Sequence, residues 1–235
     1  MKKIAPEMYW VEGLRSGNVY LLETASGLCL IDTGMAGDVK QIVSQIEEGG
    51  FSANNLEYVI LTHSHSDHSG GVSELVRRSA ARVLAHREEQ PYIEGTKRLP
   101  SGSVFQEVFM WMEDRFAGKM RTIIVNQKLE DGDILDEIQE LHVFHVPGHT
   151  PGSICLYQKE KKILFAGDLL FNGNPFTGRG GLRFAPRMFS VNPENLVQSA
   201  KAISSIPVKI LCPGHGIPIS KESPVPLKDF IHHLL

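Results

Sequence analysis

A histidine cluster at the end of an apolar run is the feature that most restricts the fold of this chain. The stretch THSHSDHSGG, residues 62–71, holds His63, His65, Asp67 and His68 and opens where the strand-like run LEYVILT ends. Chance alone would produce the spacing H-x-H-x-D-H in roughly one such chain in a thousand. Imidazoles packed this closely would repel one another when partly protonated. Neutral imidazoles and carboxylates are ligands of Zn²⁺ and similar cations, so the cluster predicts a metal site.

Length, charge and cysteine content narrow the class of protein. A chain of 235 residues with 42% hydrophobic content can bury a full core, so we expect one domain over residues 1–235. The net charge of −3 offers no basic surface for a polyanion, so nucleic acid is not an expected partner. No signal peptide or membrane span is recognisable, which predicts a cytoplasmic protein without membrane contact. Cys29, Cys155 and Cys212 are widely spaced in apolar runs and are expected to be buried thiols.

Short strand-like runs alternate with helical segments along the chain. NVYLLET and GLCLIDTG are apolar runs joined by Ala-Ser-Gly, which predicts a hairpin. Residues 36–48 carry Val39, Ile42, Val43 and Ile46 at helical spacing and end at a glycine pair. Further strands are expected at ARVLAH, ELHVFHV, SICLYQK, KKILFAGD and VKILCPGHG, with further helices at GGVSELVRRSA, from Pro193 to Ser204 and over residues 224–234. The alternation is typical of a mixed α/β or α+β domain.

Three polar residues outside the histidine cluster have the setting expected of further ligands. His149 in VPGHTPGS, Asp168 in FAGDLLF and His215 in CPGHG each follow an apolar run and lie beside glycine. Glycine lets the backbone turn sharply and direct a neighbouring side chain. The remaining histidines lack this setting and are interpreted as structural.

The order of these residues resembles the metallo-β-lactamase-fold hydrolase superfamily, and most of all its glyoxalase II-like branch. The likeness runs from about Tyr20 to Gly216 and implies a four-layer αββα sandwich with a dinuclear metal site. The ligands it implies are His63, His65 and His149 for the first metal, Asp67, His68 and His215 for the second, and Asp168 as a bridge between both. Asp32 in IDTG matches an aspartate that lies behind the ligands and orients a histidine ring.

The implied chemistry is hydrolysis by a hydroxide that two divalent transition metals share. Zinc is the expected metal, with iron or manganese as alternatives, and such a pair lowers the pKa of its water toward roughly 7. The expected substrate is a small molecule with an activated acyl group, a thioester or a lactone, and Asp67 and Asp168 are the expected catalytic carboxylates. One alternative is a persulfide dioxygenase-like enzyme with a single Fe²⁺ held by His63, His149 and Asp168. Another is a binding module whose metals only hold the loops together.

An arginine-containing stretch after Asp168 suggests how an anionic substrate could be bound. Residues 172–187 are rich in glycine and proline, which predicts a loop. Arg179 or Arg183, with Phe176 or Phe184 as an apolar wall, could clamp a carboxylate or phosphate. The structural alternative is that these arginines pair with surface carboxylates or with another subunit of a homo-oligomer. Residues 103–116 have helical spacing and are expected to pack on the domain or to form a lid.

Overall fold

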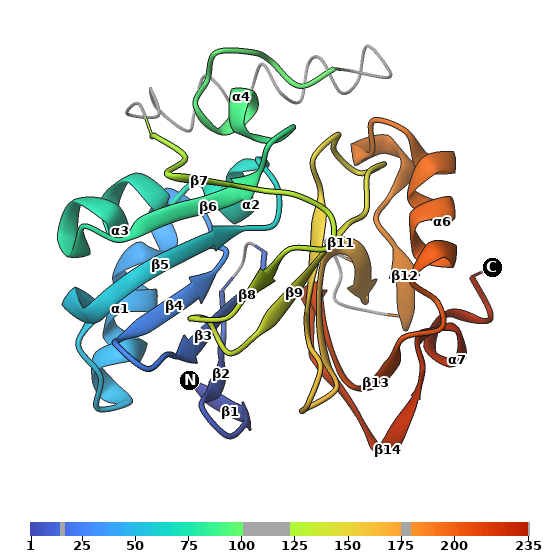
Figure 1. Ribbon diagram of the computed structural model, residues 1–235, viewed down its shortest axis with the longest axis horizontal. Helices are drawn as coiled ribbons and strands as arrows, with labels where there is room; N and C mark the ends of the chain where they lie inside the picture. Colours follow the sequence, from blue (N-terminus) through green and yellow to red (C-terminus); the bar gives the residue numbers. More distant parts are fainter. Residues whose placement is uncertain (15–16, 101–122, 175–179, 235) are drawn as a thin grey trace. The chain divides into compact units, whose positions relative to one another are not determined.

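The chain folds into two compact units, each built around its own β-sheet. A computed structural model describes residues 1–14, 17–100, 123–174 and 180–234 (Figure 1). Strands β1–β7 belong to the first unit, and strands β8–β14 belong to the second. Residues 103–116, Phe176 and Arg179 lie outside the described residues. The prediction of a lid and the predicted clamp roles of Phe176 and Arg179 therefore concern residues outside the described part of the chain. The prediction of one domain stays a prediction.

The sheet of the first unit has the strand order β1-β2-β3-β4-β5-β6-β7. Its strands are β1 (Lys2–Ala5), β2 (Met8–Val11), β3 (Val19–Glu23), β4 (Leu28–Ile31), β5 (Leu56–Leu61), β6 (Arg82–His86) and β7 (Gln127–Leu129). Pairing is antiparallel from β1 to β4 and parallel from β4 to β7. The predicted hairpin is therefore the β3–β4 pair. Parallel pairing places the carboxyl ends of β4, β5 and β6 at one edge, where Asp32 and the histidine motif follow their strands.

The described helices of this unit are α1 (Val39–Glu48), α2 (Ser66–Ser69), α3 (Val72–Ser79) and α4 (Gln90–Ile93), with 3₁₀ turns at Ala36–Asp38 and Ala53–Asn55. Helices α1 and α3 cover one face of the sheet (Figure 1). The predicted apolar stripe of α1 is buried, and it packs with α3 and the strands in one core (Figure 1). Ile42 and Ile46 are fully buried, and each such side chain contributes about 1.5–3 kcal/mol to the free energy of unfolding.

The sheet of the second unit has the strand order β14-β13-β11-β10-β9-β8, and β12 also pairs with β11. Its strands are β8 (Ile134–Leu135), β9 (Leu141–His145), β10 (Ile154–Gln158), β11 (Ile163–Asn172), β12 (Leu182–Phe184), β13 (Pro207–Gly216) and β14 (Ile219–Pro226). Two helices, α6 (Pro193–Ala202) and α7 (Leu227–Ile231), pack with these strands in a second core, and a 3₁₀ turn spans Arg187–Phe189. The parallel pair β11–β13 carries Asp168 and His215 on neighbouring strands.

Several parts of the observed fold differ from the sequence-based expectation, and the unpredicted strands include β7, β8 and β14. Strands β1 and β2 were not predicted, because their short segments show no clear strand-like pattern. They form through pairing of β1 with β2 and of β2 with β3. The glycine- and proline-rich stretch after Asp168 contains strand β12, which long-range pairing with β11 stabilises despite the weak local pattern. The final helix begins at Leu227 and not at 224, since strand β14 continues to Pro226.

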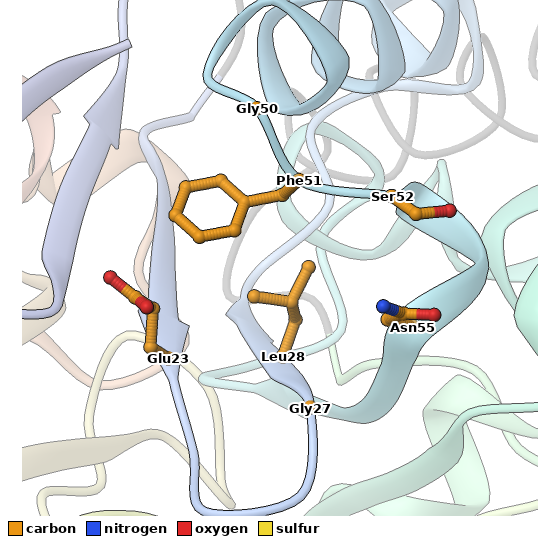
Figure 2. Close-up of a pocket in the computed structure, with 7 residues that line it drawn as sticks. All are labelled: Glu23, Gly27, Leu28, Gly50, Phe51, Ser52 and Asn55. Atoms are coloured by element: carbon orange, nitrogen blue, oxygen red, sulfur yellow. The ribbon is translucent and has the colours of Figure 1, made fainter.

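The first unit also has a surface pocket of about 380 Å³ at the amino end of β4. Figure 2 shows the Phe51 ring and the Leu28 side chain beside Glu23. The Tyr9 hydroxyl donates to Glu23 Oε1 over 2.7 Å, and this bond raises the pKa of Tyr9 to about 12. None of the predicted site residues lines this pocket, which lies at the end of β4 opposite Asp32.

Candidate metal centre

The first cluster, His63, His65, Asp67 and His68, occupies the turn that follows β5. The ring centroids of His63 and His65 are 4.9 Å apart, and those of His63 and His68 are 4.3 Å apart. Nε2 of His68 lies 3.9 Å from Oδ2 of Asp67, whose side chain is 25% exposed. His63 and His68 are fully buried, whereas His65 is partly exposed. The structure thus brings all four residues of the motif together at the edge of the first sheet.

Asp32 organises the rings of the first cluster. Its Oδ1 accepts from the Thr62 backbone N–H over 2.8 Å, and its Oδ2 accepts from the Thr62 hydroxyl over 2.7 Å. The same Oδ2 lies 2.8 Å from Nδ1 of His68. Because an ionised carboxylate only accepts, His68 carries its proton on Nδ1, and Nε2 keeps the lone pair that a metal needs.

The Thr62 hydroxyl fixes the second buried ring in the same way. Thr62 Oγ1 lies 3.1 Å from Nδ1 of His63. Since this hydroxyl donates its proton to Asp32, its oxygen accepts from His63 Nδ1–H. One buried carboxylate thereby sets the tautomer of two imidazoles, one directly and one through a hydroxyl.

Asp32 has an uncommon backbone conformation that suits its position. Its φ is +60°, in the left-handed region that non-glycine residues seldom adopt, although aspartate tolerates it better than most. Its backbone N–H donates to the Ile60 carbonyl over 2.9 Å. Strain of this kind, of order 1–3 kcal/mol, persists where surrounding contacts fix the residue, as the three carboxylate hydrogen bonds do here.

The second cluster, His149, Asp168 and His215, comes from three separate segments of the second unit. Oδ2 of Asp168 lies 3.2 Å from Nε2 of His149 and 3.6 Å from Nε2 of His215. His149 lies in the loop between β9 and β10, and His215 lies near the end of β13. The structure thus places both histidines of this cluster around one carboxylate oxygen.

Asp168 is held by a break in strand pairing and not by the end of a strand. The sequence predicted that the strand ends at Asp168, but β11 continues to Asn172. The register with β13 shifts on both sides of Gly167, whose φ is +47°. A bulge of this kind redirects a side chain within a strand. A Cβ at Gly214 would collide with Oδ1 of Asp168, so glycine is needed where β13 approaches the carboxylate.

The loop of His149 is held by α6 and by a serine. Val191 N–H donates to the His149 carbonyl over 3.0 Å, and Asn192 N–H donates to the Gly148 carbonyl over 2.8 Å. Nδ1 of His149 lies 3.3 Å from the Ser190 hydroxyl, which itself donates to the Pro186 carbonyl over 3.2 Å. The serine oxygen can therefore accept from Nδ1–H and leave the lone pair on Nε2, the atom that faces Asp168.

Both clusters suit divalent transition metals by the chemistry of their donors. Each offers imidazoles, of which His63, His68 and His149 are buried, together with a carboxylate, the donor set that binds zinc, iron and manganese. For His63, His68 and His149 the protein supplies a partner to Nδ1, an arrangement that fixes the ring of a ligating histidine. The donor chemistry of the residues present therefore fits divalent transition metals.

Two of the predicted clamp residues are placed by β12. Arg183 lies opposite Phe171 in the β11–β12 pair, and its Nε lies 3.5 Å from the Gly181 carbonyl. Phe184 packs against the core of the second unit. A third arginine of this stretch, Arg187, forms an exposed ion pair with Glu194, in keeping with the structural alternative for that residue. The substrate clamp stays a prediction.

Sequence reasoning missed the polar residues that support the ligands. Thr62 and Ser190 each lie within hydrogen-bond distance of a cluster histidine, and Glu89 accepts from the backbone of Ser64, between His63 and His65. Thr62 could have been suspected, because it immediately precedes His63 at the end of β5. Ser190 and Glu89 carry no comparable signal, since their contacts depend on tertiary structure.

Two mixed sheets with helices, each carrying a His/Asp cluster beside its strands, define an α/β metal-binding protein. The model of the metallo-beta-lactamase superfamily matches residues 13–215. The chain belongs to this superfamily, and the predicted metallo-β-lactamase fold is confirmed. Within the described ranges, no helix combines the length and apolar character needed to cross a lipid bilayer.

Relatives of known name include a hydroxyacylglutathione hydrolase and an acyl-coenzyme A thioesterase. The hydroxyacylglutathione hydrolase of Buchnera aphidicola is 30% identical over 210 residues, which cover 88% of this chain and 65% of that enzyme. The human acyl-coenzyme A thioesterase MBLAC2 is 28% identical over 200 residues, covering 74% of this chain and 67% of that protein. The crystal structure of TTHA1623 in a di-iron-bound form has a TM-score of 0.63 and 30% identity, and the match covers 89% of this chain and 92% of that one. The predicted membership of the superfamily is thereby confirmed, and hydroxyacylglutathione hydrolases are among the relatives.

Proposed function

We propose that this protein is a dinuclear metal-dependent hydrolase that cleaves a thioester or a lactone. The observation that carries the proposal is that both units present His/Asp clusters whose buried imidazoles are held through Nδ1. The ligands we propose are those of the sequence pattern: His63, His65 and His149 would hold one metal ion, Asp67, His68 and His215 would hold the other, and Asp168 would be a ligand of both. Zinc is the metal we propose, and the di-iron form of TTHA1623 makes iron the alternative.

When bound, two divalent ions would supply an activated water and polarise the substrate carbonyl. The residues of this chain do the remaining work. Asp32 and Thr62 hold His63 and His68 in one tautomer, so that their rings do not reorient during turnover. Asp67 is the cluster carboxylate with solvent access, and in the proposal its Oδ2 passes a proton to bulk water.

Thioesters are favoured as substrates by the relatives. An acyl-coenzyme A and a hydroxyacylglutathione share a thioester carbonyl, although they differ in the rest of the molecule. Both are also anionic, which agrees with the proposed role of Arg183 near the second cluster's strand β11. The shared reactive group, and not glutathione or coenzyme A, is therefore what we propose that this site recognises.

The test combines metal analysis with a substrate panel. Protein reconstituted separately with Zn²⁺, Mn²⁺ and Fe²⁺ is assayed against an acyl-glutathione, an acyl-coenzyme A, a lactone and a phosphodiester. We expect close to two metals per chain by elemental analysis and hydrolysis of a thioester or lactone above that of the phosphodiester. A fully active form with one iron and oxygen uptake would contradict the proposal in favour of a dioxygenase. Two bound metals with no turnover of any substrate would favour a binding module.

A further inference from the structure

Glu89 is a buried carboxylate that the proposed hydrolysis does not use. It follows β6 and precedes α4, and its side chain is 0% exposed, which is rare for glutamate. Its backbone N–H donates to the His86 carbonyl over 2.9 Å, and its own carbonyl accepts from Tyr92 and Ile93, each over 3.1 Å. The turn therefore fixes the backbone of Glu89 and points its side chain into the protein.

The carboxylate of Glu89 reaches the loop that carries the first two histidines. Its Oε1 accepts from the backbone N–H of Ser64 over 2.8 Å. Ser64 stands between His63 and His65, and its carbonyl accepts from the Ser69 hydroxyl over 2.9 Å. Glu89 and Ser69 thus fix this residue from both sides, Glu89 through a hydrogen bond that its charge strengthens.

The position of Ser64 determines how the two neighbouring rings are arranged. The rings of His63 and His65 lie 4.9 Å apart at an angle of 82°. Rotation of the Ser64 backbone would change both the distance and the angle, because its two dihedral angles lie between the two side chains. A hydrogen bond to Ser64 N–H therefore limits the arrangement of two proposed ligands at once.

The charge of Glu89 adds to this geometric effect. A buried carboxylate attracts a nearby cation more strongly than an exposed one, because the surrounding dielectric constant is lower. The charge of Glu89 would therefore favour a metal cation at the adjacent cluster. The influence of the carboxylate extends to Tyr92, since burial raises the pKa of its phenol and the charges of Glu89 and Glu88 raise it further.

We propose that Glu89 is a positioning residue of the metal site: it holds Ser64 so that His63 and His65 meet a metal in a fixed arrangement, and its negative charge strengthens cation binding. This inference rests on the proposed function only in requiring that the first cluster binds metal. It does not depend on which substrate the protein cleaves.

The experiment measures Zn²⁺ binding directly in the full chain. Glu89→Gln removes the charge but keeps an acceptor oxygen, Glu89→Ala removes both, and Glu88→Gln is the matched control at an exposed neighbour. Dissociation constants are obtained by competition with a chromophoric chelator, and melting temperatures are measured with and without Zn²⁺. Loss of a residue behind metal ligands typically weakens metal binding roughly 10- to 100-fold. We expect Glu89→Gln near the lower value, Glu89→Ala near the upper value and Glu88→Gln unchanged.

The rise in melting temperature caused by Zn²⁺ separates positioning from support of the fold. We expect this rise to shrink in Glu89→Gln, because weaker binding stabilises the native state less. If Glu89→Gln melts earlier without metal but keeps the wild-type rise and affinity, Glu89 only supports the fold and the proposal is overturned. The same conclusion follows if the variant fails to fold even with saturating Zn²⁺. If the wild-type protein shows no measurable Zn²⁺ affinity and no rise in melting temperature with Zn²⁺, the proposed function itself is wrong, and the role of Glu89 falls with it.

Discussion

The two clusters present similar ligands but are built in different ways. The first cluster is almost contiguous in sequence, and buried side-chain hydrogen bonds from Asp32, Thr62 and Glu89 hold it. The second cluster gathers three distant residues, and it depends on the β11–β13 pairing, a bulge at Gly167 and close approach at Gly214. Substitution of a supporting carboxylate is therefore expected to disturb the first cluster more. Substitutions that crowd the backbone are expected to disturb the second cluster more.

Loss of Asp168 should have the largest effect. Its Oδ2 lies near both His149 and His215, and in the proposed site Asp168 would be a ligand of both metals. Losing several kcal/mol of transition-state stabilisation corresponds to a decrease of about a thousandfold in kcat/KM, which we expect for Asp168→Ala. Steady-state kinetics with metal analysis should show a larger loss than for His63→Ala or His149→Ala. The exposed Asp136 gives the control Asp136→Ala, and near wild-type turnover with both metals in Asp168→Ala would refute the bridging role.

Asp32→Asn and Ser190→Ala compare the supports of the two clusters. Asparagine keeps the size of Asp32 and tolerates its positive φ, but an amide N–H₂ in place of Oδ2 can accept from neither Thr62 nor His68. We expect a 10- to 100-fold decrease in Zn²⁺ affinity, roughly the usual range for such partners. Ser190→Ala should lose less, because its contact with His149 is longer at 3.3 Å. Chelator competition measures both, and equal losses would show that the two clusters are supported alike.

Two glycine substitutions are expected to affect the second cluster more than the first. A Cβ at Gly17 would overlap the His68 ring, whereas a Cβ at Gly214 would overlap Asp168 and the Gly167 backbone. Overpacking usually costs about 1–3 kcal/mol of unfolding free energy. Urea unfolding should show a larger loss for Gly214→Ala than for Gly17→Ala, since backbone yields less readily than a side chain. Gly37→Ala and Gly181→Ala are matched controls, because nothing lies within 4 Å of a Cβ at either position. A larger loss of unfolding free energy for Gly17→Ala than for Gly214→Ala would contradict the view that the second cluster depends more on close backbone approach.

The buried thiols should show the smallest difference between the units. Burial raises the pKa of Cys29 in the first unit and of Cys155 and Cys212 in the second. At pH 8 in native buffer we expect no alkylation of any of the three, because the thiolate is the reactive form. With rising urea we expect all three to react at one midpoint, as a single domain over residues 1–235 predicts. Mass spectrometry of each peptide measures this, and reaction of Cys29 at lower urea than the others would disprove the single domain.

Sequence alone predicted the elements whose signal is local. The β3–β4 hairpin, the apolar stripe of α1 and the strands preceding Asp32 and His63 follow from residue patterns within short windows. Strands β1 and β12 did not, because they are defined by long-range pairing. The same contrast holds for the site. All seven proposed ligands are in the sequence pattern, but Glu89 and Ser190 become recognisable only when the fold brings them to Ser64 and His149.

The separation of the two clusters along the chain also affects how a newly made molecule meets its metal. His63, His65, Asp67, His68 and Glu89 leave the ribosome well before His215. At synthesis rates of about 5–20 residues per second, the delay is on the order of ten seconds. During that time the nascent chain offers an incomplete set of strong ligands to whichever cation is most abundant. The identity of the metal in the finished protein can therefore depend on the cell's metal supply during translation as well as on the final coordination geometry.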